Sequence, residues 1–305
     1  MTRPPAPRPA PAVRLHPRTA GAIVLASAAG ALAFCWPLLV RSSSPLGGST
    51  DAPLLLAGVL VAVLAVVAVA LGEGGLDVKA VAILGLLTAV GSVLRPLSAG
   101  TAGVELIFVV IVLGGRVFGA GFGFALGSTT VLASALLTGG VGPWMPFQML
   151  AASWVGLGAG LLPRRLRGRG EIAVLAGYGA LGALVFGLAM NLSFWPFQVG
   201  TASELSFVAG APVADNLQRF WLFSAATSLG WDVGRALTTA IGIALLGAGV
   251  LAALRRTAAR ARFAPAQAPA QSAVVATRAH ADTPSIPRSG QLALPAAARS
   301  PADSP

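Results

Sequence analysis

Long apolar runs recur along most of this chain, and the residues between them are rich in Gly, Pro and charged side chains. A helix needs about 20 consecutive apolar residues to cross the hydrocarbon core of a bilayer. Eight apolar runs lie at roughly residues 20–40, 52–71, 78–94, 104–114, 117–138, 146–162, 172–192 and 232–254, of which 104–114 is shorter than a full span. The pattern predicts an all-α integral membrane protein with eight transmembrane helices.

Two regions do not divide cleanly into spans. Residues 104–138 are too long for one crossing, and we predict a break at Gly114-Gly115-Arg116. Residues 217–230 are also apolar, but a ninth span would place the following arginines outside the cell. We expect residues 217–230 to form an outer-side helix or lid that leads into the last span.

Composition supports the membrane class. Apolar residues make up 55% of the chain and charged residues 10%, whereas a soluble domain is about 25% charged. The net charge is +11, but the arginines lie mostly at the ends of apolar runs and in the terminal segments. No basic face is interleaved with aromatic residues, so the pattern excludes a nucleic-acid partner.

The arginine positions predict how the chain crosses the membrane, because basic residues favour the cytoplasmic side. Eight crossings place the N-terminal arginines, the cluster at 164–169 and the cluster at 255–262 inside. We therefore expect a multi-pass plasma-membrane protein with both termini in the cytoplasm. Its expected parts are a disordered basic arm (1–19), a transmembrane hairpin (20–71), a six-helix core (78–254) and a disordered cytoplasmic tail (255–305).

The residues that catalysis and metal binding require are scarce. A nucleotide-binding Walker A loop needs a glycine-rich turn followed by lysine, and the chain has one lysine, Lys79, with no such loop before it. Cys35 is the only cysteine, and the two histidines lie in the terminal segments. The sequence predicts no enzymatic activity and no cofactor. Energy for transport would come from a partner or from an ion gradient.

Glycine spacing predicts close packing between helices. Gly115, Gly119, Gly123 and Gly127 recur every fourth residue, which would place them on one helix face. Small residues on a shared face let a second backbone approach closely within a membrane. Packing explains this stretch better than a nucleotide-binding loop does.

Ionisable residues are rare inside the runs. Glu105 lies near the outer end of its run, and Asp232 and Arg235 share one helical face near the start of the last run, where they can pair. The span centres hold no charged residue and no histidine. This distribution argues against a proton relay, which needs ionisable groups within the membrane.

Three segments rich in glycine, proline or aromatic residues fall on the outer face if eight helices cross: 95–101, 139–148 and 191–216. Aromatic rings beside isolated amides and a few charges are typical of a ligand pocket, although an aromatic belt at the headgroup level is the alternative. The candidate substrate-binding residues are Arg95, Glu105, Trp144, Phe147, Gln148, Asn191, Phe194 and Trp195.

Several of these residues resemble a known family. The residues concerned are Gly115-Arg116-Val117-Phe118-Gly119, the run at 138–150 around Gly142-Pro143-Trp144, Arg95-Pro96, and Asn191 with Phe194-Trp195-Pro196. Residues 78–254 resemble the substrate-binding S components of energy-coupling factor (ECF) transporters, in particular actinobacterial members. The hairpin at 20–71 and the long tail depart from this pattern.

The resemblance implies a division of labour. An S component captures a vitamin or related micronutrient, with cobalamin or another corrinoid the first candidate here. It then docks on a transmembrane coupling subunit that is joined to two cytoplasmic ABC ATPases. Family members dock through small residues on the first core helix, and the matching residues here are Gly85 and Ala89.

Two other functions stay open at this point. A self-sufficient, ion-coupled secondary transporter would need coupling groups near the midplane, between inverted halves of the chain. A membrane enzyme would need a nucleophile with its base or a metal cluster, and a scaffold would need neither.

Overall fold

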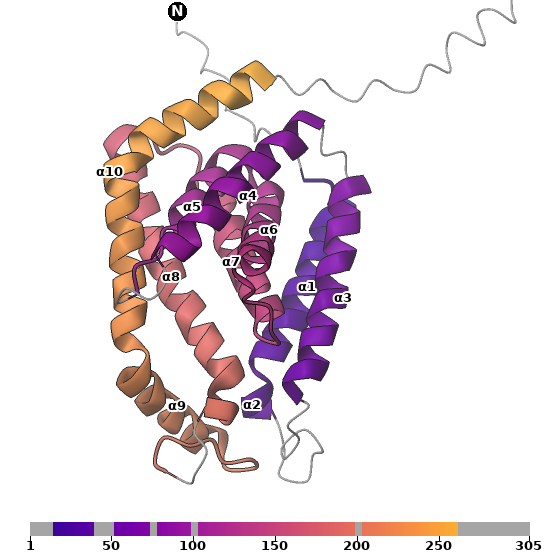
Figure 1. Cartoon of the computed structure of the whole chain (residues 1–305), viewed down its shortest axis with the longest axis vertical. Helices are drawn as coiled ribbons and strands as arrows, with labels where there is room; N and C mark the ends of the chain where they lie inside the picture. Colours follow the sequence, from indigo (N-terminus) through magenta and orange to yellow (C-terminus); the bar gives the residue numbers. More distant parts are fainter. Residues whose placement is uncertain (1–14, 40–51, 74–77, 99–102, 199–202, 262–305) are drawn as a thin grey trace, which may run out of the picture. The chain divides into compact units, whose positions relative to one another are not determined.

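The computed structural model describes residues 15–39, 52–73, 78–98, 103–198 and 203–261. Every regular element within these ranges is a helix (Figure 1). The helices are α1 (Pro17–Phe34), α2 (Trp36–Leu39), α3 (Ala52–Glu73), α4 (Val78–Ser98), α5 (Ile107–Phe118), α6 (Ala120–Thr138), α7 (Met145–Leu161), α8 (Gly168–Gln198), α9 (Val213–Thr227) and α10 (Leu229–Ala261).

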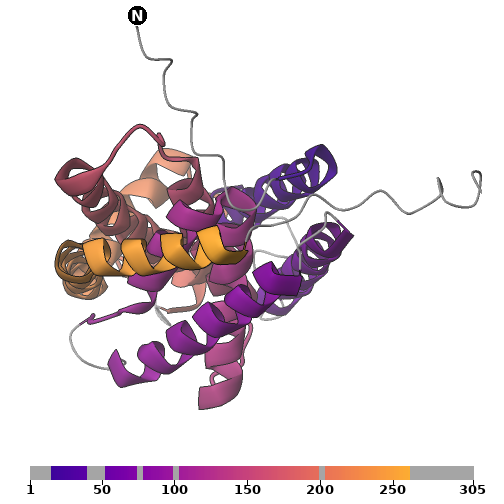
Figure 2. The same ribbon diagram turned by 90° about the horizontal axis from the view of Figure 1, so that it is seen from above.

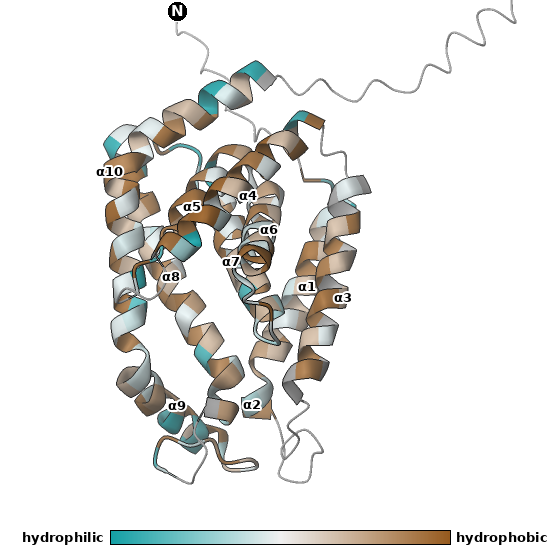
Figure 3. Ribbon diagram, viewed as in Figure 1, coloured by the Kyte–Doolittle hydropathy of each residue, from teal (hydrophilic) through white to brown (hydrophobic). Residues whose placement is uncertain are grey.

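Five of the described helices, α1, α4, α6, α8 and α10, are long and apolar enough to cross a membrane. Shorter apolar helices lie at 56–69, within α3, and in α5. Figure 3 shows that hydrophobic residues recur along the helices, with few strongly hydrophilic positions. The all-helical membrane class is therefore confirmed, whereas eight crossings are not.

The six runs predicted for the core correspond to α4, α5, α6, α7, α8 and α10. The predicted break at Gly114-Gly115-Arg116 is wrong, because α5 continues through these residues to Phe118. The chain breaks instead at Gly119, whose φ of 110° lies in a region that side chains rarely tolerate. This glycine separates α5 from α6.

The core glycines bring α5 and α6 against α7. A Cβ atom at Gly115 or Gly123 would overlap the backbone of Gly156, and one at Gly127 would overlap the backbone of Ala152. Close packing is thus confirmed, but the four glycines do not share one helix. Gly115 lies on α5, and Gly123 and Gly127 lie on α6.

Helices α1 and α3 pack side by side, as Figures 1 and 2 both show. The helix α1 also packs against the core. The ring of Phe34 contacts Phe147 at 5.1 Å between centroids, and Trp154 on α7 donates a hydrogen bond of 2.9 Å to Ser27. The N-terminal helices therefore belong to the same packed unit as the core.

Two boundaries differ from expectation. The helix α1 begins at Pro17, inside the segment expected to be a disordered arm, and α10 runs on to Ala261, inside the expected tail. Alanine, leucine and arginine are among the strongest helix formers, and they dominate residues 251–261. The remainder of both terminal segments, 1–14 and 262–305, lies outside the described residues.

Residues 213–227 form α9, immediately before α10. The apolar stretch at 217–230 is thus mostly a separate helix that leads into the last long one. Figure 1 places α9 beside the end of α8, where the cavity described next is found.

Candidate ligand-binding site

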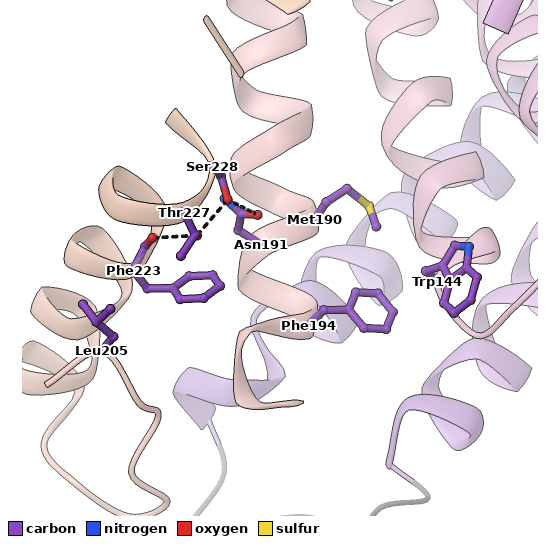
Figure 4. Close-up of a pocket in the computed structure, with 8 residues that line it drawn as sticks. All are labelled: Trp144, Met190, Asn191, Phe194, Leu205, Phe223, Thr227 and Ser228. Carbon is purple, nitrogen blue, oxygen red and sulfur yellow. Dashed lines mark hydrogen bonds between the residues drawn. The ribbon is translucent and has the colours of Figure 1, made fainter. Parts of the chain in front are cut away.

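A cavity of about 600 Å³ lies where the C-terminal half of α8 meets α9 and the start of α10. Figure 4 shows its side chains. They come from the loop before α7, from α8, from the loop after α8, and from the junction of α9 and α10. The lining residues are Trp144, Met190, Asn191, Phe194, Leu205, Phe223, Thr227 and Ser228.

Three aromatic rings provide most of the apolar wall. Phe194 and Phe223 enter from α8 and α9, and Trp144 lies across from Phe194 (Figure 4). The ring of Trp144 folds back over Gly142, where an added Cβ would come within 2.5 Å of it. The Gly142-Pro143-Trp144 motif therefore has a physical role, because glycine leaves the space that the indole fills.

The polar wall is a chain of hydroxyl and amide groups. Ser228 donates a 3.1 Å hydrogen bond to the side-chain oxygen of Asn191, and its hydroxyl lies 3.1 Å from that of Thr227. Thr227 donates in turn to the carbonyl of Phe223. These bonds fix the direction of the Asn191 amide, which is half-buried at the edge of the cavity.

Two predicted binding residues are buried away from this cavity. Phe147 is 1% exposed and packs its ring against Phe34 and Phe194. Trp195 is fully buried among Phe207, Phe220 and Phe223, and its indole N–H donates to the carbonyl of Leu205 at 2.6 Å. Both residues support the cavity wall from behind. Adjacent residues such as Phe194 and Trp195 point in different directions from a helix. The sequence pattern did not show which of the two faces the cavity.

The other three predicted residues meet in an ionic cluster, which we name the Glu105 cluster. Glu105 pairs with Arg235 at 2.7 Å and with Arg95 at 3.7 Å. Arg95 donates a 2.9 Å hydrogen bond to Gln148 on α7. The predicted pairing of Asp232 with Arg235 is also present, at 2.8 Å.

Packing accommodates the Glu105 cluster against α8. A Cβ at Gly187 would overlap the carboxylate of Asp232, so glycine is needed at this point of α8. The guanidinium of Arg235 lies 5.3 Å from the ring centroid of Phe186, which is a favourable cation–π distance. The cluster therefore joins α4, α7, α8 and α10 around the residues that precede α5.

A second ionic cluster, the Glu171 cluster, lies at the other end of α5. Glu171 is 1% exposed and pairs with Arg116 at 2.7 Å and with Arg255 at 2.6 Å. Arg116 also donates to the carbonyls of Leu162 and Pro163. It thus satisfies the carbonyl of Leu162, which caps the end of α7, and that of Pro163 just beyond the helix.

The sequence did not single out five of the cavity residues: Met190, Leu205, Phe223, Thr227 and Ser228. The apolar stretch at 217–230 could have pointed to three of these residues, because Phe223, Thr227 and Ser228 lie within it. No group of three or more His, Cys, Asp or Glu side chains that could hold a metal ion occurs in the described part of the chain. The cavity is suited to binding through stacking and hydrogen bonds rather than to metal chemistry.

Comparison with known proteins agrees with this arrangement. Residues 79–254, more than half of the chain, match the family model described as the substrate-specific component of the ECF transporter. No curated protein and no solved structure matches the chain. Members of this family are non-enzymatic transport subunits that work with a separate energising module. The chain therefore belongs to the family of ECF transporter substrate-specific components, and it is a multi-pass membrane subunit for transport rather than an enzyme.

Proposed function

We propose that this S component captures a small micronutrient in the cavity between α8, α9 and the loop before α7. One observation carries the proposal. Trp144, from the loop before α7, lines the same cavity of about 600 Å³ as Asn191 and Phe194, which lie on α8. Ligand sites of this kind combine apolar and aromatic walls with a few orienting polar groups.

The lining chemistry favours an uncharged ligand with an aromatic or conjugated ring. Three aromatic side chains offer stacking surfaces, and Asn191, Thr227 and Ser228 offer hydrogen bonds. None of the lining residues is charged. A corrinoid remains a candidate because of the family resemblance, but its macrocycle would have to extend beyond the cavity. The volume favours a smaller vitamin.

We assign Arg95, Glu105 and Gln148 a supporting role. Their polar atoms bind one another and Arg235, and these residues are absent from the cavity wall. They position α4, α7 and α10 around the site. A ligand contact would have to break this network, and buried charges are costly to leave without partners.

Docking is assigned to the face of α4 that carries Gly85 and Ala89. Both residues are exposed, and no atom lies within 4 Å of a Cβ built at Gly85. Small exposed residues allow a helix of the coupling subunit to approach closely. In this proposal two cytoplasmic ABC ATPases drive the coupling subunit, and both termini of the chain face the cytoplasm.

Ligand binding by the purified protein tests the site. A screen of vitamins in detergent without ATP should find a ligand, and Trp144→Ala should weaken its binding by about tenfold or more, since stacking on aromatic rings contributes about 1.5 kcal/mol. Trp231→Ala is the matched control, because Trp231 is exposed and lies outside the cavity. Equal affinity of the Trp144 variant and the wild type would refute the assignment.

Uptake in vesicles tests docking separately. Gly85→Leu should retain ligand binding in detergent but lose ATP-driven uptake when the coupling subunit and the ATPases are supplied. Gly177→Leu on α8 is the control, since Gly177 is also exposed with no atom near its Cβ position. Full uptake by the Gly85 variant would show that docking uses another surface. Uptake by the chain alone, driven by an ion gradient, would overturn the need for partners.

A further inference from the structure

A second cavity, of about 420 Å³, lies between α8 and α10, at the end that carries the Glu171 cluster. One wall is a row of alanines on α10, at positions 244, 248 and 252, which face Ile172 on α8. All three alanines are exposed, so the cavity opens on the flank of the helix pair. Arg169, Glu171 and Arg255 line its polar end.

The position of the cavity matches a lipid that lies along the protein. The long apolar segments of α8 and α10 end at Gly168 and Arg260 respectively, so the two arginines lie near the ends of both candidate spans. A groove on the flank of a spanning helix pair faces acyl chains. Its small side chains leave space for one chain, and its charged end lies where phospholipid headgroups begin.

Positive charge at this end is in large excess. Glu171 is the only acidic residue within 162–171 and 252–261, and it already pairs with Arg116 and Arg255. Seven arginines occupy the same two ranges: Arg164, Arg165, Arg167, Arg169, Arg255, Arg256 and Arg260. Burial, and to a smaller extent the charge of nearby Arg116, lowers the pKa of Arg164.

The guanidinium groups of the two arginines at the cavity are more exposed than those of the Glu105 cluster, so their N–H groups can bind an external anion. The Arg255 side chain is 46% exposed although it contacts Glu171. Arg169 is exposed, and none of the described carboxylates pairs with it. Guanidinium groups bind phosphate through two parallel hydrogen bonds.

From these observations we propose that the cavity between α8 and α10 binds one anionic phospholipid. Its phosphate lies between Arg169 and Arg255, and one acyl chain follows the alanines of α10. The lipid joins α8 to α10 at the end of the bundle where the Glu171 cluster lies. This site is separate from the proposed micronutrient cavity.

Native mass spectrometry of the full chain, released from micelles with added lipid, tests the proposal. Phosphatidylglycerol should remain bound at one copy, and phosphatidylcholine should not. The double variant Arg169→Gln/Arg255→Gln should bind phosphatidylglycerol about tenfold more weakly, because it removes both phosphate contacts. Arg165→Gln/Arg256→Gln is the control, since it removes the same charge outside the cavity. Equal losses in both double variants would mean a general charge effect and would overturn the site.

A substitution that fills the groove distinguishes binding of a whole lipid from binding of a free anion or a protein partner. Ala248→Phe should block phosphatidylglycerol retention, whereas Ala253→Phe, on an exposed position outside the cavity, should not. Retention that survives Ala248→Phe, or binding of inorganic phosphate as tight as that of the lipid, would overturn the acyl-chain assignment. A cooperative thermal transition in lipid-free detergent shows that each variant is folded. Retention of both lipids alike would equally refute the proposal.

Discussion

Two glutamates hold the two ends of α5 in place, and their surroundings differ. Glu105 precedes the helix and contacts Arg95 and Arg235, whereas Glu171 contacts Arg116 in the last turn of the helix and Arg255 on α10. Each carboxylate thus serves two arginines. In the Glu105 cluster, Asp232 supplies a second negative charge. In the Glu171 cluster, no second acid is present among the described residues.

The Glu105 cluster is a network of balanced charges, whereas the Glu171 cluster carries surplus positive charge. The Glu105 cluster has two acids and two arginines, and none of its residues lines the proposed micronutrient cavity. The Glu171 cluster has one acid for two arginines, and further arginines surround it. Balanced charges favour a structural role, whereas surplus guanidinium groups can bind an anion from outside the protein. The two clusters therefore respond differently to loss of their acid.

The largest effect on stability should follow Glu171→Gln. The side chain of Arg116 is 4% exposed, and this substitution leaves its charge buried without a counter-ion. Removing one partner of a buried ion pair costs about 3–5 kcal/mol. The free energy of unfolding can be measured in mixed micelles by titration with a denaturing detergent. Glu204→Gln is the control, because Glu204 is exposed. If Glu171→Gln and Glu204→Gln lost the same free energy of unfolding, the Glu171 cluster would not contribute to stability as proposed.

Glu105→Gln should cost less, about 1.5–3 kcal/mol, the range for a lost hydrogen bond to a charged group. Arg235 keeps Asp232 at 2.8 Å and its contact with Phe186, and Arg95 keeps its hydrogen bond to Gln148. The arginine closest to Glu105 therefore retains an acidic partner. The same titration applies. If this variant lost as much stability as Glu171→Gln, the second acid would not compensate, and the contrast between the clusters would fail.

The smallest effect is expected for Arg255→Gln in lipid-free detergent, below about 1 kcal/mol. Its side chain is 46% exposed, and exposed ion pairs contribute little. Glu171 keeps Arg116 at 2.7 Å after the change. The loss should shrink further as salt is raised, because ions screen exposed charges. A loss that exceeds that of Glu105→Gln would show that Arg255 is an essential part of the buried pair.

Residues near the cavity show how far a sequence pattern reaches. Segments rich in glycine, proline or aromatic residues, at the ends of the long runs and between them, led to Trp144, Asn191 and Phe194, which do line one cavity. The same pattern included Phe147 and Trp195, which are buried behind the wall. Composition identifies which segments are unusual. The direction of each side chain depends on helical phase and on neighbours far away in the sequence.

The break between α5 and α6 gives a similar lesson. Gly114, Gly115 and Gly119 are all candidates in a long apolar stretch, and the pattern alone does not rank them. Gly115 stays helical because α7 packs closely against it, and Gly119 adopts the positive φ that ends the helix. Contacts with α7, which lies later in the chain, decide between them.

Long apolar runs and sparse charge were enough to establish a helical membrane protein and the approximate positions of its six core helices, and the motif pattern showed that the sequence contains no Walker A loop. These properties depend on residue types within short stretches, since the bilayer acts as a solvent on each stretch separately. Which arginine meets which carboxylate depended on the three-dimensional packing. Glu105 and Arg235 are 130 positions apart, and no local rule relates such distant residues.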